Sequence, residues 1–209
     1  WMPFSRYLFN TVAITLIGTI GHILLASLCA YSLSKIPFPG AGAVFQVIVL
    51  SLMFSPVATT VPTYIIMSKI GLVDTLWAVI LPALQSSLGL YLIKQFLDTL
   101  PDTMLEAARI DGAGEMRLFF RIVMPNLKPA WLTLGILSIQ SLWNIVSPYT
   151  YSEELKTLPQ ALSQIVSAGI SRSGVGSAVA LLMIVVPIFC FVVAQGNIIQ
   201  TMSTSGMKD

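Results

Sequence analysis

Long apolar segments alternate with short polar ones along the whole chain. Five segments are long enough to cross a bilayer as helices, because about 20 apolar residues span its hydrocarbon core. They run over residues 8–33, 43–67, 76–97, 131–149 and 174–199. This pattern predicts an all-α integral membrane protein, folded as a single transmembrane domain over residues 1–209.

Two of the predicted helices carry interruptions. Residues 43–67 contain Pro56 and Pro62, and residues 76–97 contain Pro82 followed by the polar run Gln85-Ser86-Ser87. Proline cannot donate a backbone hydrogen bond, but membrane helices tolerate it where neighbouring groups satisfy the freed carbonyls. We therefore expect kinks at these positions.

The longest stretch that could not rest in lipid covers residues 99–129, which hold eight of the twenty charged residues. It lies between two apolar segments. A charged stretch in this position belongs in water, so the pattern places it at one face of the membrane.

Residues 99–129 also have the signals of a helix–turn–helix. Thr103 and Glu106 have the spacing of a capping box, which predicts a helix start. Gly112 can adopt positive φ and end that helix. A second helical run should cover residues 115–124 and end at Pro125 and Pro129, because neither proline can donate a backbone hydrogen bond.

Composition agrees with a membrane protein and excludes other classes. The chain is 56% apolar and 10% charged, whereas soluble domains are about 25% charged. The net charge of +2 is too small to indicate a nucleic-acid partner.

The 99–129 stretch resembles a family signature. It is similar to the cytoplasmic EAA loop of the membrane subunits of ATP-binding-cassette (ABC) importers. The matching residues are Glu106-Ala107-Ala108, then Gly112, then Ile122-Val123-Met124-Pro125, with Met124 where leucine is usual. In that family the loop forms a coupling helix that docks into a groove on the ATPase subunit. The resemblance implies these docking residues: Glu106, Ala107, Ala108, Arg109, Asp111, Gly112 and Pro125.

The resemblance covers nearly the whole chain, and Asp111 before Gly112 is typical of the carbohydrate-uptake (maltose-type, binding-protein-dependent) branch. Members usually have six transmembrane helices, so the first would be absent here. The resemblance implies a second homologous permease, two ATPase subunits that bind ATP and Mg²⁺, and an extracellular solute-binding protein. An amino-acid or peptide substrate remains an alternative.

The chain lacks motifs for catalysis. It has no G-x-x-x-x-G-K-[ST] phosphate loop, so we expect no ATPase activity, no metal site and no cofactor bound by this chain itself. Its single histidine, His22, and the lack of acidic residues deep in the apolar segments argue against an ion- or proton-coupled secondary transporter, the less favoured alternative. A lone histidine in an apolar segment is most often a hydrogen-bonded packing residue, and we expect this role for His22.

A substrate path is predicted from polar and aromatic side chains within the apolar segments. Sugars are held by amides, hydroxyls and aromatic faces. The candidates are Gln85, Ser86, Gln140, Trp143 and Asn144. Each could equally form hydrogen bonds between helices.

Charge sets the expected orientation. If residues 99–129 are cytoplasmic and the helices alternate, seven of the eleven Lys and Arg residues fall on the inner side, as the positive-inside rule requires. The polar segment 150–173 then faces outward, where a solute-binding protein would dock. We expect a bacterial-type inner membrane, multi-pass, with the C-terminus in the cytoplasm.

Overall fold

The computed structural model describes residues 3–167 and 173–205, which contain helices and connecting turns but no strands. The α-helices are α1 (Phe4–Lys35), α2 (Ala41–Ser51), α3 (Pro56–Lys69), α4 (Trp77–Leu84), α5 (Ser87–Asp98), α6 (Asp102–Ile110), α7 (Glu115–Leu118), α8 (Met124–Asn126), α9 (Lys128–Trp143), α10 (Leu158–Ser167) and α11 (Ser173–Ser205). A π-helical turn, η1 (Phe119–Val123), joins α7 to α8, and a 3₁₀ turn, η2 (Glu153–Leu155), precedes α10.

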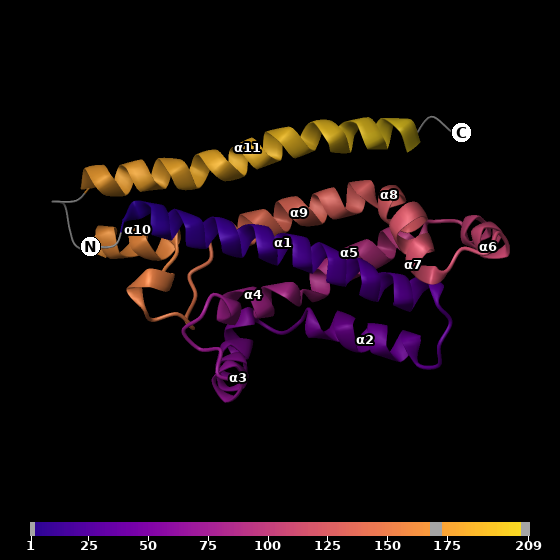
Figure 1. The fold of residues 1–209 in the computed structure, drawn as a ribbon, viewed down its shortest axis with the longest axis horizontal. Helices are drawn as coiled ribbons and strands as arrows, with labels where there is room; N and C mark the ends of the chain where they lie inside the picture. The colour runs from indigo at the N-terminus through magenta and orange to yellow at the C-terminus, as the bar shows by residue number, and fades with distance from the viewer. Residues whose placement is uncertain (1–2, 168–172, 206–209) are drawn as a thin grey trace.

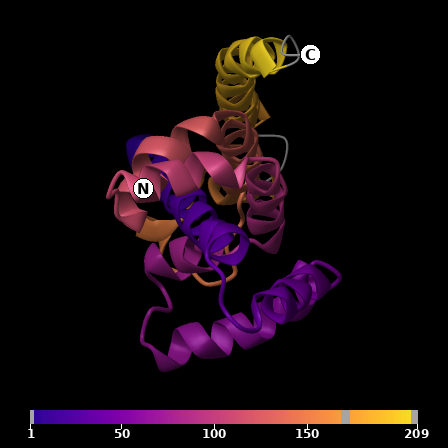
Figure 2. The ribbon, with the colours of Figure 1, turned by 90° about the vertical axis from the view of Figure 1, so that its right-hand side faces the viewer.

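Helix α1 runs through the middle of the molecule and packs on α4, α5 and α9 (Figure 1). Helix α11 lies on one side against α9 and α10, and α2 and α3 lie on the opposite side (Figure 2). Helix α6 lies at one end of the bundle, called here the α6 end, and α10 lies at the other, the α10 end (Figure 1).

The fold agrees with an all-α membrane protein. Among the described residues, three helical segments are long and apolar enough to cross a membrane: Phe4–Lys35, Trp77–Asp98 and Gly174–Val193. Two bent helix pairs raise the number to five if each pair is one span. The upper number matches the sequence prediction.

The predicted helix over residues 43–67 was wrong as a continuous element. It is divided into α2 and α3, which meet at 109°. Pro56 disfavours helical backbone at the preceding residue, and Ser55 is extended, with φ −66° and ψ 135°. The Ser55 hydroxyl then accepts a hydrogen bond from the N–H of Val57 at 3.3 Å, which begins α3.

Two further boundaries differ from prediction. Helix α9 ends at Trp143, not at residue 149, and the polar segment 150–173 contains η2 and α10. Residues 168–172 of that segment, and residues 206–209 of the predicted cytoplasmic tail, lie outside the described residues.

The core is densest at the α6 end. Its largest buried cluster joins α1, α5, α6, α7, η1 and α9 and includes Tyr31, Ile93, Leu105 and Phe119. Small residues bring α1 and α5 together beside this cluster. The Nδ1 atom of the buried His22 lies 2.9 Å from the Ser138 hydroxyl, which gives this histidine the packing role expected from the sequence.

Gly89 in α5 is required for this close approach. A Cβ added there would lie 2.3 Å from Nε2 of His22 and 2.9 Å from Cδ1 of Leu134. We expect Gly89→Ala to lower the free energy of unfolding by about 1–3 kcal/mol through overpacking. Denaturant unfolding in detergent measures this. Gly42→Ala is the control, because no atom lies within 4 Å of its added Cβ. Equal stability of the two variants would contradict the close packing of α1 and α5 at Gly89.

Candidate functional site

Helix α6 begins differently from prediction. Its N-cap is Pro101, whose backbone is extended, and no side chain caps the first turn. The capping box of Thr103 and Glu106 was therefore wrong, because the helix starts at Asp102, one residue before Thr103. The Asp102 carboxylate stabilises this end instead, since a negative charge in the first turn interacts favourably with the helix dipole.

Gly112 ends α6 as predicted. Its φ is 80°, in the left-handed region that glycine adopts without strain. Its N–H donates to the carbonyl of Arg109 at 3.0 Å, and the N–H of Ala113 donates to the carbonyl of Ala108 at 3.0 Å. No atom lies within 4 Å of a Cβ built on Gly112, so the turn requires glycine for its backbone conformation alone.

Helix α6 is largely exposed. Leu105 is its single buried residue, whereas Glu106 and Ala107 are exposed and Ile110 is 86% exposed. Within the described part of the chain, the Glu106 side chain has no hydrogen bond or ion pair. The first two residues of the Glu106-Ala107-Ala108 signature are thus open to a partner, while Ala108 is half-buried against the core.

Arg109 faces the protein itself. Its Nε donates to Oε1 of Glu115 at 2.8 Å, and its Nη2 lies 3.5 Å from the carbonyl oxygen of Lys35. Asp111, the C-cap residue of α6, is exposed. Of the seven predicted docking residues, Arg109 is therefore the one that the structure engages in an internal ion pair.

The second helical run passes through Pro125, so its predicted end at this residue was wrong. Residues 119–123 form a π-helical turn in which the N–H of Met124 donates to the carbonyl of Phe119. This wider turn places the proline, which has no N–H, inside a continuing helix. The bend of 77° comes after Asn126, and Pro129 lies in the first turn of α9.

An open groove of about 600 Å³ lies between α6 and the turn that follows α1. The sequence Lys35–Gly40 forms that turn, with two prolines and Phe38. The groove lining includes Lys35, Phe38, Pro39, Asp102, Glu106 and Arg109. Glu106 therefore stands at the edge of a concave, mixed apolar and charged surface.

The predicted substrate-path residues fall into two groups. Gln85 and Ser86 form the break between α4 and α5, where Ser86 is the N-cap and its hydroxyl accepts from the N–H of Gly89 at 3.3 Å. Gln140 and Asn144 are exposed near the end of α9, and the Asn144 amide donates to the Gln140 carbonyl at 2.9 Å.

Trp143 differs from the other four because it is 3% exposed. Its indole N–H donates to the carbonyl of Met183 at 3.1 Å, which ties α9 to α11. A Trp N–H that is buried usually finds such a partner. Packing between helices accounts for this residue.

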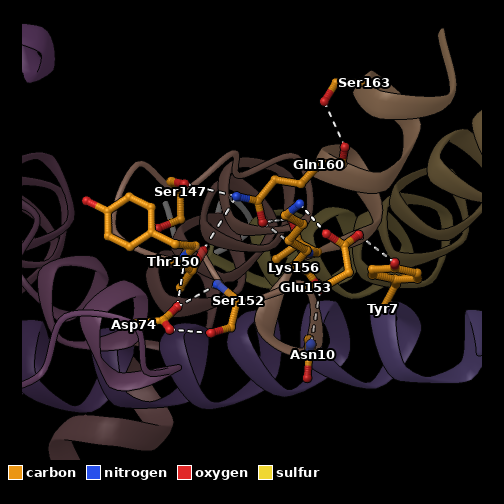
Figure 3. Close-up of polar contacts among 12 residues, drawn as sticks. Tyr7, Asn10, Asp74, Ser147, Thr150, Ser152, Glu153, Lys156, Gln160 and Ser163 are labelled. Atoms are coloured by element: carbon orange, nitrogen blue, oxygen red, sulfur yellow. Dashed lines mark hydrogen bonds and ion pairs between the residues drawn. The ribbon is translucent and has the colours of Figure 1, made fainter. Parts of the chain in front are cut away.

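A polar network that the sequence pattern does not indicate covers the α10 end (Figure 3). Asp74 accepts hydrogen bonds from the N–H groups of Tyr151 and Ser152, both at 2.8 Å, and from the Ser152 hydroxyl. Gln160 accepts from the N–H of Thr157 and donates to the carbonyl of Ser147, each at 2.9 Å. The Asp74 pairs join residues 77 and 78 positions apart, so they leave no local sequence signal.

The hydrogen bonds of Asp74 should make the stability of the fold depend on pH. Hydrogen bonds from Ser152 and from the N–H of Tyr151 lower the pKa of its carboxyl. The pKa of this carboxyl is about 4 in the unfolded chain and lower in the folded protein. The ionised carboxylate therefore stabilises the fold at pH values above about 4, and this stabilisation is lost as the pH falls through the folded-state pKa. We expect Asp74→Asn to unfold at a lower temperature than wild type above about pH 5, and the gap to close in more acidic solution.

Asn is the appropriate substitution because the φ of Asp74 is 61°, a conformation that Asn tolerates. Thermal unfolding of both proteins between about pH 3 and pH 7 measures the effect. A gap that widens in acid would contradict the depressed pKa of Asp74.

Comparison with known proteins places the chain in a class and then in a family. A sequence model of the family "binding-protein-dependent transport system inner membrane component" matches residues 11–204. The match covers nearly the whole chain. The protein is therefore a membrane permease component, and it belongs to this family.

Curated relatives carry similar names. The polygalacturonan/rhamnogalacturonan transport system permease protein YtcP of Bacillus subtilis is 33% identical over 149 residues, covering 66% of this chain and 51% of the relative. The sn-glycerol-3-phosphate transport system permease protein UgpE of Yersinia enterocolitica is 36% identical over 142 residues, covering 68% and 50%. The chain spans about half the length of the curated relatives it matches.

Solved structures share the fold. A bacterial ABC transporter that imports the acidic polysaccharide alginate has a chain that aligns with a TM-score of 0.83 at 23% identity, covering 92% of this chain and 74% of that one. The inward-facing MetNI methionine ABC transporter aligns with a TM-score of 0.66 at 16% identity, covering 93% and 94%.

Proposed function

We propose that this chain is the transmembrane permease subunit of an ATP-driven importer for carbohydrates. The observation that carries this proposal is α6, a short exposed helix that presents Glu106 and Ala107 at one end of the bundle and stops at the left-handed turn of Gly112. Leu105 is the single buried residue of α6, and the rest of the helix is largely exposed, as expected of an element whose main contacts lie in another subunit.

The proposed docking surface is α6 with its groove. Glu106 offers an unpaired charge, Ala107 and Ala108 allow a close approach, and Asp111 and Gly112 shape the end of the helix. Pro125 is exposed on the following run. Arg109 would act indirectly, by holding α6 against Glu115. ATP and Mg²⁺ would be bound by two ATPase subunits, whose closure moves α6 and switches the attached helices between inward-open and outward-open states.

Substrate class is inferred from relatives. Permeases named for polygalacturonan or rhamnogalacturonan and for sn-glycerol-3-phosphate are about one-third identical to this chain. Asp111 before Gly112 also favours the carbohydrate branch over amino-acid or peptide importers. Within the membrane, Gln85, Ser86, Gln140 and Asn144 are the proposed polar contacts to sugar, and Trp143 supports them by packing α9 against α11.

The remaining partners follow from the orientation. With the α6 end and the C-terminus in the cytoplasm of a bacterial-type inner membrane, the α10 end faces outward, toward a solute-binding protein. Exposed apolar side chains cover α2, α3 and α11, such as Val47, Val57 and Phe189. We propose that lipid and a second, homologous permease subunit cover these surfaces.

The experiment that tests the proposal is co-purification of this chain with its ATPase subunits. We expect Glu106→Lys to reduce the recovered ATPase at least about tenfold, since reversal of a charge in a docked surface costs one to several kcal/mol. Glu154→Lys is the matched control, with the same charge change on an exposed residue at the α10 end.

The control should retain the ATPase, and both variants should unfold at the wild-type temperature, because neither carboxylate has a hydrogen bond or ion pair among the described residues. Equal recovery of the ATPase with both variants would overturn the docking role of α6.

A further inference from the structure

Helix α1 is tied by polar contacts to segments at both ends of the molecule. At the α10 end it contacts residues 153–158, and at the α6 end it contacts α6 and the start of α7. Figure 1 shows α1 running between these two ends. Both sets of contacts join residues that are far apart in the sequence, so they are properties of the fold and not of local turns.

At the α6 end, Lys35 and Tyr31 make the contacts. The Lys35 side chain is 5% exposed, and its ammonium donates to the carbonyl of Leu100 at 2.7 Å and to Asp102 at 2.8 Å. The Tyr31 hydroxyl donates to Glu115, which also pairs with Arg109. A buried ammonium needs such partners, because an uncompensated charge in the interior is strongly unfavourable.

These links matter because α6 has little other attachment. Leu105 is its single buried residue, and the half-buried Ala108 adds a small apolar contact. Asp102 and Arg109 stand at the two ends of α6, and each is joined to α1, directly or through Glu115. Helix α6 is therefore joined to α1 at two points.

At the α10 end, the contacts are buried and equally direct. The Asn10 side chain is 1% exposed and donates to the carbonyls of Glu154 and Lys156 at 2.7 and 3.0 Å. The Thr11 hydroxyl accepts from the N–H of Leu158 at 2.9 Å. Figure 3 shows Asn10 beneath this segment, with Tyr7 pointing toward Glu153.

Between these contacts, α1 is one uninterrupted helix. It has 32 residues and no proline, and Asn10 and Tyr31 lie about 32 Å apart along its axis at 1.5 Å per residue. The neighbouring segments are interrupted. The α2–α3 pair is bent by 109°, residues 115–143 are bent by 77°, and Gln85-Ser86 separates α4 from α5. A kinked segment can bend further at its kink, whereas a continuous helix moves as a rigid unit.

We propose that α1 is the mechanical connection between α6 and residues 153–158, with Tyr31 and Lys35 as positioning residues at one end and Asn10 and Thr11 at the other. Nucleotide-driven movement of α6 would reach the opposite face of the protein through this helix. The inference rests on the proposed function, since it requires an ATPase seated on α6, and it assigns roles to residues outside the Glu-Ala-Ala signature.

The test is backbone hydrogen exchange in the assembled transporter, with and without a non-hydrolysable ATP analogue and Mg²⁺. In the wild type, we expect nucleotide to change the exchange of residues 153–158 by about fivefold or more, the usual lower range of coupling between distant sites. Tyr31→Phe combined with Lys35→Met should reduce that change to less than about twofold. Ser34→Ala, which removes a contact from the same turn of α1 to Asp98 of α5, should retain it.

Each outcome decides the inference. A nucleotide-dependent change that survives the double substitution, or that is absent from the wild type while the ATPase remains bound, would overturn the role of α1 and leave the proposed function intact. If no ATPase binds the wild type, the proposed function itself fails. If the double variant does not assemble, Asn10→Ala carries the test: the change should persist at residues 102–110 and disappear at residues 153–158.

Discussion

Gly112→Val is expected to reduce transport at least about tenfold while the chain still inserts into the membrane. Gly112 has φ of 80°, and a β-branched residue is strained there by about 1–3 kcal/mol or more. The turn would relieve this strain by rotating its backbone, which would redirect α6 relative to α7. Uptake of substrate in cells, with the amount of membrane-inserted protein measured in parallel, gives the result.

The matched control is Gly112→Asn. Asn tolerates the left-handed region, and no neighbouring atom lies within 4 Å of the added Cβ, so space for the side chain is not the obstacle. We expect this variant to keep most of the transport activity. If Gly112→Val transports as well as Gly112→Asn, the direction of α6 does not matter and the docking proposal loses its structural basis.

Trp143→Ala is expected to have the largest effect on stability. The side chain is 3% exposed, belongs to the cluster with Leu158 and Val179, and donates to the carbonyl of Met183. Loss of its volume leaves a cavity between α9 and α11, and such truncations lower the free energy of unfolding by about 3–5 kcal/mol. Denaturant unfolding in detergent measures the loss.

Trp143→Phe separates packing from hydrogen bonding. It keeps an aromatic ring and removes the N–H donor, so we expect a smaller loss, of about 1–3 kcal/mol, from the unpaired carbonyl and the reduced volume. A normal stability in Trp143→Ala, together with a changed apparent affinity for sugar, would contradict the packing role and return Trp143 to the substrate path.

The sequence predicted features that depend on local backbone chemistry. Gly112 could be assigned a left-handed turn because few other residues adopt positive φ at low cost. The break at Gln85-Ser86 followed from a polar run within an apolar segment. Pro56 indicated a kink, but the extent of the bend depended on the extended conformation that proline imposes on Ser55, and this turned one predicted helix into two.

Other features depend on contacts that no local pattern encodes. Thr103 and Glu106 have capping-box spacing, but Pro101 begins the helix earlier and makes that pattern inoperative. The Asp74–Ser152 and Tyr31–Glu115 hydrogen bonds each join residues more than 70 positions apart. The family resemblance implied that Arg109 is a docking residue, and only the fold shows that its charge is paired with Glu115.

In the proposed function, α6 contacts an ATP-hydrolysing subunit in the cytoplasm. The most direct test is a photo-reactive amino acid at position 110, because Ile110 is 86% exposed at the end of α6. Irradiation of intact cells should join this chain to the ATPase subunit, and a photo-reactive group at the exposed Glu154 should not. Attachment to an extracellular protein from position 110, or attachment to the ATPase from position 154 alone, would show that α6 is not the surface that contacts the ATPase.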